Sequence, residues 1–216
     1  MIKPQYALSY SNSKRTPNWV SWELTQNWLG PIDRSNDFRP DDTLPAGWPR
    51  VTSTDYTGSG YDRGHMTPSG DRTNTRADNS ATFLMTNILP QASDNNKGPW
   101  AELEIYCRSL VKSGKSLYII AGGAGKKQIL PRGGITVPTK VWKVIVVRDR
   151  PGIDLSDINA STRVIAVSMP NINGVGNNWR SYRVSVDQIE ALTKYDLLSN
   201  LPIPIQQAIE SKSDRL

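Results

Sequence analysis

Residues 61–68 read Tyr-Asp-Arg-Gly-His-Met-Thr-Pro, and they include His65, the only histidine among 216 residues. A histidine can exchange a proton near neutral pH without a large shift of its pKa. Asp62 and Arg63 place a carboxylate and a guanidinium beside it, and Gly64 lets the backbone approach a ligand closely. A lone histidine is more often buried in the core or idle on the surface, but these neighbours favour a catalytic role.

Other segments of the chain accompany this motif. Asp71-Arg72-Thr73 follows it closely, and Asp94-Asn95-Asn96 lies further downstream. With these segments the sequence resembles the DNA/RNA non-specific endonucleases of the ββα-metal (His-Me finger) superfamily, and among them the sugar-non-specific secreted nucleases of cyanobacterial type. The resemblance extends over nearly the whole chain, through residues 1–10, 37–41, 62–65, 83–87, 94–96, 103–104 and 106–108.

Composition and charge are compatible with this class. A mass of 24.0 kDa and 37% hydrophobic residues are enough for a hydrophobic core and fit a single domain over residues 1–216. The net charge of +6 and the isoelectric point near 9.5 favour polyanions, although a merely soluble basic protein would show the same balance. Cys107 is the single cysteine, so neither an intramolecular disulfide nor a cysteine-rich zinc site can form.

Targeting signals are absent from this sequence. No apolar run approaches the length of a membrane span, and the start at residues 1–4 lacks the apolar core of a signal peptide. The family that the chain resembles is usually exported. We therefore expect a secreted or periplasmic protein whose leader is missing from this sequence, with no membrane partner.

Hydrophobic periodicity predicts the elements of the first half of the chain. Alternation over residues 5–29 predicts a β-hairpin around the polar turn 11–14. Residues 30–60, rich in proline, predict an extended irregular segment. The apolar run 83–85 predicts a central strand, and the spacing of apolar residues over 98–113 predicts the longest helix.

The second half alternates strands and glycine-rich turns before two helices. Ser185 and Gln188 form a capping box that predicts the start of a helix. The strand candidates lie at 117–120, 141–147, 163–167 and 179–184, and the helix candidates at 186–194 and 205–212. We expect an α+β domain with a mixed, mainly antiparallel central sheet and flanking helices. The resemblance adds a ββα-metal active-site motif.

Hydrolysis of a phosphodiester bond assigns a chemical task to each of these residues. His65, at a strand end, would be the general base, because its ordinary pKa of roughly 6.5 lies close to the working pH. A base cannot bind a metal ion at the same time, so a divalent cation needs oxygen ligands elsewhere. The resemblance implies that Asn96 is the single direct protein ligand. One amide oxygen leaves most positions around the ion to water and phosphate, which suits Mg²⁺, with Mn²⁺ as a substitute.

Five further residues have candidate roles. Glu104 lies two helical turns after Asn96 and would accept hydrogen bonds from metal-bound water. Arg108 follows one turn later, although this spacing is equally that of an ordinary surface ion pair with Glu104. Arg34 and Arg63 match family positions that bind the scissile phosphate. Asp62 would orient metal-bound water or fix a neighbouring arginine.

The predicted substrates are DNA and RNA, single and double stranded, because the sequence contains no element that reads base edges. The products would carry 5′-phosphates, and a dedicated inhibitor protein is a possible further partner. The alternatives are a narrower nuclease of the same superfamily, a non-catalytic nucleic-acid-binding module, and a serine or cysteine hydrolase. Intact His65, Asn96 and Glu104 argue against the second, and the third lacks a nucleophile motif.

Overall fold

The computed structural model describes residues 1–149 and 155–216. Its strands are β1 (Ala7–Ser11), β2 (Thr16–Leu24), β3 (Asp62–His65), β4 (Ile88–Gln91), β5 (Ser116–Ala124), β6 (Gln128–Ile129), β7 (Thr136–Val137), β8 (Lys140–Arg148), β9 (Val164–Pro170) and β10 (Arg183–Val184). Its α-helices are α1 (Arg76–Ala81), α2 (Ser93–Asn95), α3 (Ala101–Lys112), α4 (Val186–Thr193) and α5 (Ile203–Glu210). Short 3-10 turns cover Gln26–Trp28, Ser53–Tyr56, Ser69–Asp71, Met85–Asn87, Leu155–Asp157 and Trp179–Tyr182.

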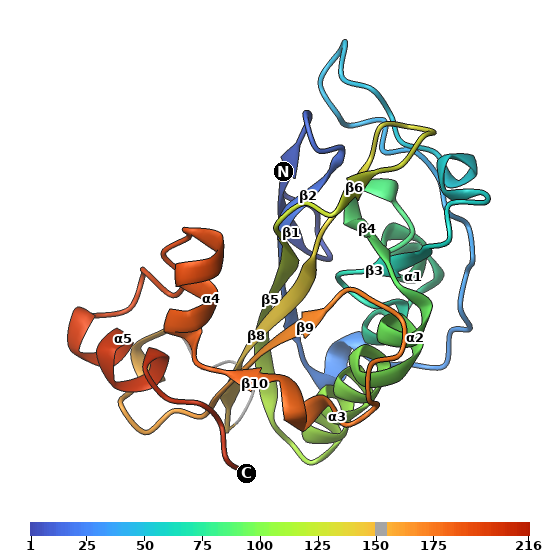
Figure 1. Ribbon diagram of the computed structural model, residues 1–216. Coiled ribbons are helices and arrows are strands. Elements are labelled where there is room, and N and C mark those ends of the chain that lie inside the picture. Colours follow the sequence, from blue (N-terminus) through green and yellow to red (C-terminus); the bar gives the residue numbers. More distant parts are fainter. Residues whose placement is uncertain (150–154) are drawn as a thin grey trace.

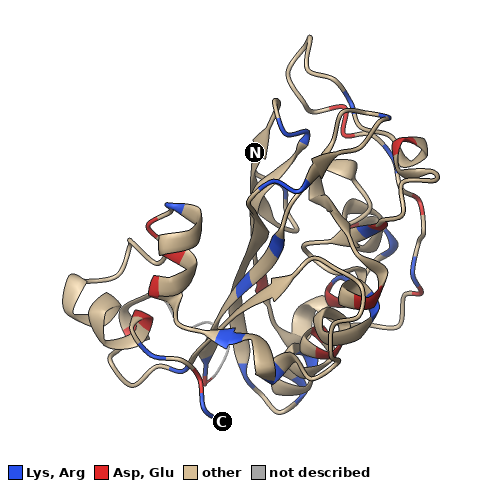
Figure 2. Cartoon of the chain, viewed as in Figure 1, with Lys and Arg blue, Asp and Glu red and all other residues tan. Residues whose placement is uncertain are grey.

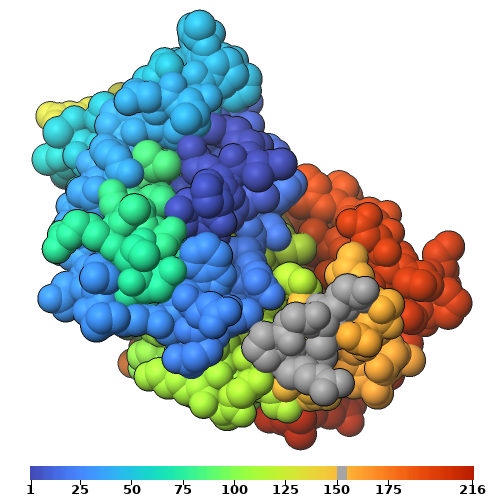
Figure 3. Space-filling model, turned by 180° about the vertical axis from the view of Figure 1, so that it is seen from behind, coloured from blue at the N-terminus to red at the C-terminus, as the bar shows by residue number. Residues whose placement is uncertain are grey.

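A six-stranded sheet divides the described part of the chain into two layers. Its strand order is β1-β2-β5-β8-β9-β10, and every neighbouring pair is antiparallel. Helices α1 to α3 and the β3–β4 pair lie on one side of the sheet, and α4 and α5 lie on the other (Figure 1). Seen from behind, the C-terminal residues form a lobe beside the N-terminal segments (Figure 3). The α+β class with a mainly antiparallel sheet is confirmed.

Alternation along the central strands builds a separate core on each face of the sheet. Leu117 and Ile119 of β5 pack in the cluster that includes α3, whereas Tyr118 and Ile120 pack against the cluster that includes α4 and α5. Successive side chains of a strand point to opposite faces, so one sequence supplies both cores. Helix α3 buries an apolar stripe that contains Leu103. The substitution Leu103→Ala would lower the free energy of unfolding by about 2–5 kcal/mol.

Two predicted strands were misplaced. Residues 83–85 do not form the central strand, because the chain turns through Met85–Asn87 and becomes a strand only at Ile88. Apolar character alone does not separate a buried turn from a buried strand. Of residues 179–184, only Arg183 and Val184 are in a strand, because Asn178 caps a 3-10 turn over Trp179–Tyr182.

The other predicted elements were confirmed with shifted ends. The hairpin 5–29 and the strands at 117–120, 141–147 and 163–167 are present, and the irregular segment 30–60 contains a single 3-10 turn. The Ser185–Gln188 capping box forms in both directions at the start of α4. No helix in the described part of the chain is long and apolar enough to cross a membrane.

Candidate active site

The motif that contains His65 lies in a strand–strand–helix unit. Strand β3 pairs antiparallel with β4, with Asp62 opposite Gln91 and His65 opposite Ile88. A side chain at Gly64 would collide with the side chain of Gln91, so glycine is required for this close pairing. After β4 the chain passes through α2 and an irregular turn over Asn96–Trp100 into α3. The helix predicted at 98–113 is therefore α3, which begins at Ala101 after the kinked turn.

The structure brings the sequence-predicted site residues together. A cavity of about 450 Å³ is lined by Arg34, Arg63, His65, Asn96, Glu104 and Arg108. Asp62 lines an adjoining cavity of about 380 Å³ that shares Arg34, Arg63 and Asn96 with the first. These side chains come from an irregular loop, a strand, a turn and a helix, and the β3–β4–α3 unit places them around one space.

His65 is buried and electrically neutral. The residue is 8% exposed, and its ring lies 5.3 Å from the Phe38 ring and 4.8 Å from the Phe83 ring, measured between centroids. Burial, together with the positive charges of Arg34 and Arg63, lowers the pKa of His65 to about 3. The expectation of an ordinary pKa near 6.5 was wrong. A phosphate placed between the two arginines would offset their charge and raise this pKa.

Asn96 is oriented by a carboxylate. Its amide Nδ2 donates a hydrogen bond of 3.0 Å to Asp62 Oδ2, and Lys97 Nζ lies 3.4 Å from the same oxygen. An ionised carboxylate only accepts hydrogen bonds, so it fixes the amide nitrogen toward itself. The amide oxygen Oδ1 is then left for a ligand in the cavity. Asp62 thus acts on Asn96 rather than on a neighbouring arginine.

Glu104 has a buried cation as its partner. The Glu104 side chain is 16% exposed, and its Oε1 lies 3.8 Å from Nζ of Lys143, which is 1% exposed. Burial raises the pKa of Glu104 to about 7, while the charge of Lys143 lowers it. Lys143 Nζ also lies 4.1 Å from the centroid of the Trp100 ring. Sequence reasoning missed Lys143, although a lysine inside the apolar run 141–147 was a usable signal.

Arg108 does not pair with Glu104. Its Nη1 donates a hydrogen bond of 3.0 Å to Oδ1 of Asp71, which is itself buried and accepts a 3.1 Å hydrogen bond from Trp22 on Oδ2. The i,i+4 spacing suggested a surface ion pair, but the 3-10 turn at Ser69–Asp71 presents a better acceptor. Arg108 thereby joins α3 to the turn that follows the His65 motif.

The two phosphate-binding candidates rest on aromatic rings. Arg34 donates hydrogen bonds to Asn36 (2.7 Å) and Ser69 (2.9 Å), and its guanidinium carbon lies 4.9 Å from the centroid of the Phe83 ring. Arg63 is exposed, with its guanidinium carbon 4.2 Å from the centroid of the Phe38 ring. Stacking on a ring orients a guanidinium while leaving N–H donors for a ligand. Phe38 and Phe83 were not predicted as site residues.

Other polar and reactive groups near the site are structural. Cys107 is buried in the core, which raises the pKa of its thiol to about 12 and leaves no thiolate for nucleophilic attack. The side chain of Asn87 binds the backbone of Thr67 and Thr82. Trp100 is buried and cannot stack on a base.

Comparisons with known proteins place the chain among nucleases. The family model for DNA/RNA non-specific endonucleases matches residues 1–203. A protein named Nuclease from Nostoc sp. (strain PCC 7120 / SAG 25.82 / UTEX 2576) is 58% identical over 214 residues, which are 99% of this chain and 78% of that protein. The mitochondrial nuclease EXOG of Xenopus laevis is 32% identical over 203 residues, which are 87% of this chain and 55% of that protein.

A solved structure shares the fold. The crystal structure of the EndoG/EndoGI complex, titled for the mechanism of EndoG inhibition, contains a chain with a TM-score of 0.80 and 26% sequence identity. The match covers 94% of this chain and 86% of that chain. The present chain spans about half the length of the mitochondrial EXOG relative, so that protein has further sequence outside the shared region.

Proposed function

The chain belongs to the DNA/RNA non-specific endonuclease family, and from this premise we propose that it hydrolyses phosphodiester bonds of both DNA and RNA with His65 as general base. The main support for the proposal is the cavity of about 450 Å³ that the candidate site residues line together. A neutral imidazole, two ring-stacked guanidinium groups and an amide oxygen converge there. These groups match the needs of the reaction, namely a proton acceptor, charge stabilisation and a cation ligand.

The chain's own residues divide the work as follows. His65 takes the proton from the attacking water, and it is unprotonated at neutral pH because its pKa is lowered. Arg34 and Arg63 bind the phosphoryl oxygens, where negative charge grows in the transition state. Arg108 acts as a positioning residue, since its bond to Asp71 holds the turn that carries Ser69, the partner of Arg34.

The donor set of the cavity fits a hydrated divalent cation. Asn96 Oδ1 is free because Asp62 holds the amide nitrogen, and the Glu104 carboxylate lines the same cavity. Few protein oxygens are offered, which suits Mg²⁺, an ion that keeps several waters, and Mn²⁺ in its place. Asn96 would hold the ion directly and Glu104 would accept hydrogen bonds from its waters. Such an ion would supply positive charge to the departing 3′ oxygen, and the products would then carry 5′-phosphates.

Substrate choice follows from contacts to the backbone of the nucleic acid. Arg34 and Arg63, which line the cavity, would bind phosphates, and phosphates are common to DNA and RNA, single and double stranded. Sequence preference should therefore be weak. A nuclease with a narrower substrate remains the alternative, because the mitochondrial relatives also match most of this chain.

The test is digestion of supercoiled plasmid and total RNA by the wild type and by His65→Ala, each with and without EDTA. We expect the wild type to degrade both substrates only without EDTA, and the variant to lose about 10²- to 10⁴-fold in rate. Cleavage of RNA alone would support the narrower alternative. Undiminished cleavage by a folded His65→Ala variant would overturn the assignment of the base.

Two further proposals concern partners and location. The EndoG chain with the same fold was solved in an inhibitor complex, which supports a protein inhibitor for this chain as well. Competition between an inhibitor and a phosphodiester substrate would test whether it covers the cavity. We also propose that the protein acts outside the cytoplasm, and fractionation of cells that express the full-length gene would test this.

A further inference from the structure

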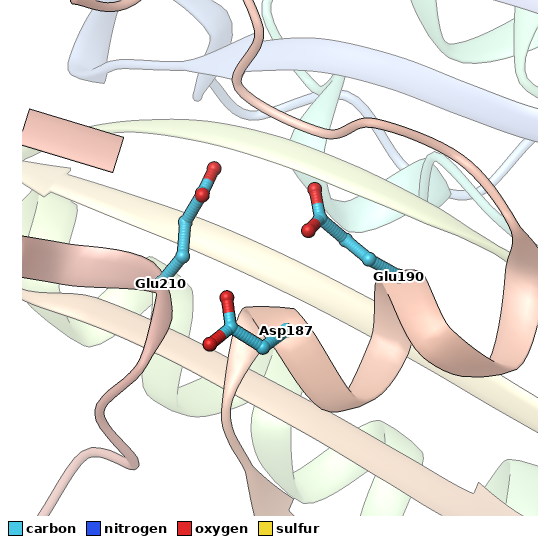
Figure 4. Close-up of side chains that lie close together, drawn as sticks. All are labelled: Asp187, Glu190 and Glu210. Atoms are coloured by element: carbon cyan, nitrogen blue, oxygen red, sulfur yellow. The ribbon is translucent and has the colours of Figure 1, made fainter. Parts of the chain in front are cut away.

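Three carboxylates converge far from the active site. Asp187 and Glu190 project from α4 and Glu210 from the end of α5, and one ligand oxygen of each lies within 4.8 Å of the others. Figure 4 shows the three side chains pointing toward the same space between the two helices. In Figure 2 acidic positions on α4 and α5 stand apart from those on α2 and α3, across the sheet. The site therefore cannot share a metal ion with Asn96.

Glu210 is buried without a partner. It is 5% exposed, and its Oε1 is inaccessible and has no hydrogen-bond partner among the described residues. It is also the last residue of α5, where the backbone carbonyls disfavour a negative charge. An unsatisfied carboxylate oxygen in such a position normally requires a proton or a cation.

The charges that shift the pKa of Glu210 are all negative. Burial raises the pKa of Glu210 most, and the charges of Glu190, Asp187 and Asp196 raise it further. Within residues 1–149 and 155–216, no salt bridge reaches Asp187, Glu190 or Glu210. Glu190 uses Oε1 to accept a hydrogen bond from the backbone N–H of Leu197, which leaves its second oxygen available.

We propose that Asp187, Glu190 and Glu210 form a binding site for a calcium-type divalent cation that joins α4 to α5. The ligands are all carboxylate oxygens, the donors that Ca²⁺ prefers, and opposite ligands of Ca²⁺ lie up to roughly 5 Å apart. Water would complete the coordination, since Asp187 is exposed. The ion neutralises the repulsion, satisfies Glu210 and connects the two helices whose apolar residues Val186, Ile189 and Ile209 form one core cluster.

The test is thermal unfolding of the full chain in the Asn96→Ala background, which removes the proposed ligand in the active site. With about 10 mM CaCl₂ in place of EDTA at pH 7.5, an open site with a Kd of roughly 10⁻⁴–10⁻³ M predicts a rise in Tm of about 3–10 °C. Glu210→Gln should abolish this rise. Calorimetric titration should find one Ca²⁺ site before this second substitution and none after it.

Glu102→Gln is the matched control. Glu102 lies in the first turn of α3 as Asp187 lies in the first turn of α4, so both substitutions alter a helix terminus equally. We expect Glu102→Gln to keep the calcium-dependent rise and Asp187→Asn to lose it, which also keeps the test valid if Glu210→Gln does not fold. If calcium does not change the Tm, or raises it as much in Glu210→Gln and Asp187→Asn as in the parent Asn96→Ala protein, the proposal is wrong and Glu210 holds a proton instead.

Discussion

Asp62→Asn tests whether a carboxylate orients the proposed metal ligand. Asparagine has nearly the same shape, but it can donate as well as accept, so it no longer dictates which end of the Asn96 amide faces the cavity. The hydrogen bond that changes is the 3.0 Å contact from Asn96 Nδ2 to Asp62 Oδ2. We expect the variant to fold normally and to need more Mg²⁺ for activity.

The size of the effect follows from the charge and exposure of Asp62. A hydrogen bond to a charged group contributes roughly 1.5–3 kcal/mol, and we take about 1–2 kcal/mol here because water can compete for the partly exposed carboxylate. That range corresponds to a roughly 5- to 30-fold rise in the Mg²⁺ concentration for half-maximal activity. The maximal rate at saturating Mg²⁺ should change little.

The assay is plasmid nicking over a Mg²⁺ titration at constant ionic strength. Asp42→Asn serves as the control, since it removes the same charge from an exposed position that pairs with Arg50 at 3.6 Å. A normal Mg²⁺ midpoint with a reduced maximal rate in Asp62→Asn would refute the reasoning. Asp62 would then act on the reaction itself rather than through Asn96.

The remaining predictions concern other side chains. His65→Gly should be inactive, and free imidazole should partly restore its activity. The rescue should increase as the pH rises through the pKa of imidazole and should require Mg²⁺ or Mn²⁺. Rescue in EDTA would contradict the assignment of His65 as general base. Lys143→Met should raise the pKa of Glu104 further, so the dependence of activity on pH should shift to higher pH. An unshifted dependence would contradict an interaction between Lys143 and Glu104. Arg34→Ala should lower kcat more than it raises KM. The affinity of the wild type for nucleic acid should fall steeply as the salt concentration rises, and an affinity that does not depend on salt would refute binding through phosphates. The pKa of Glu210 is about 7 in the folded state against 4.5 for an ordinary glutamate, so without metal the folded state binds more protons than the unfolded state between these pH values. The free energy of unfolding in EDTA should therefore fall as the pH rises from about 4.5 to 7. Urea unfolding should show this fall in the wild type and a smaller fall in Glu210→Gln.

Local patterns in the sequence were sufficient for much of the fold, whereas most of the candidate site residues came from the resemblance to the endonuclease family. The hairpin around residues 11–14, the α3 stripe and the Ser185–Gln188 capping box each depend on residues that are close in sequence. These features follow from the 2.0 and 3.6 residue periods of strands and helices, which a sequence displays directly.

Tertiary contacts decided the partners and the electrostatics. Lys143 reaches Glu104 of α3 from strand β8, and Arg108 binds Asp71 instead of its helical neighbour Glu104. The pKa of His65 depends on burial and on Arg34, which lies in a loop distant in sequence. Glu210 joins Asp187 and Glu190 only because α5 packs beside α4. Burial and charge act through space over a few ångströms, so residues far apart in the chain determine them, and no local period in the sequence encodes that proximity.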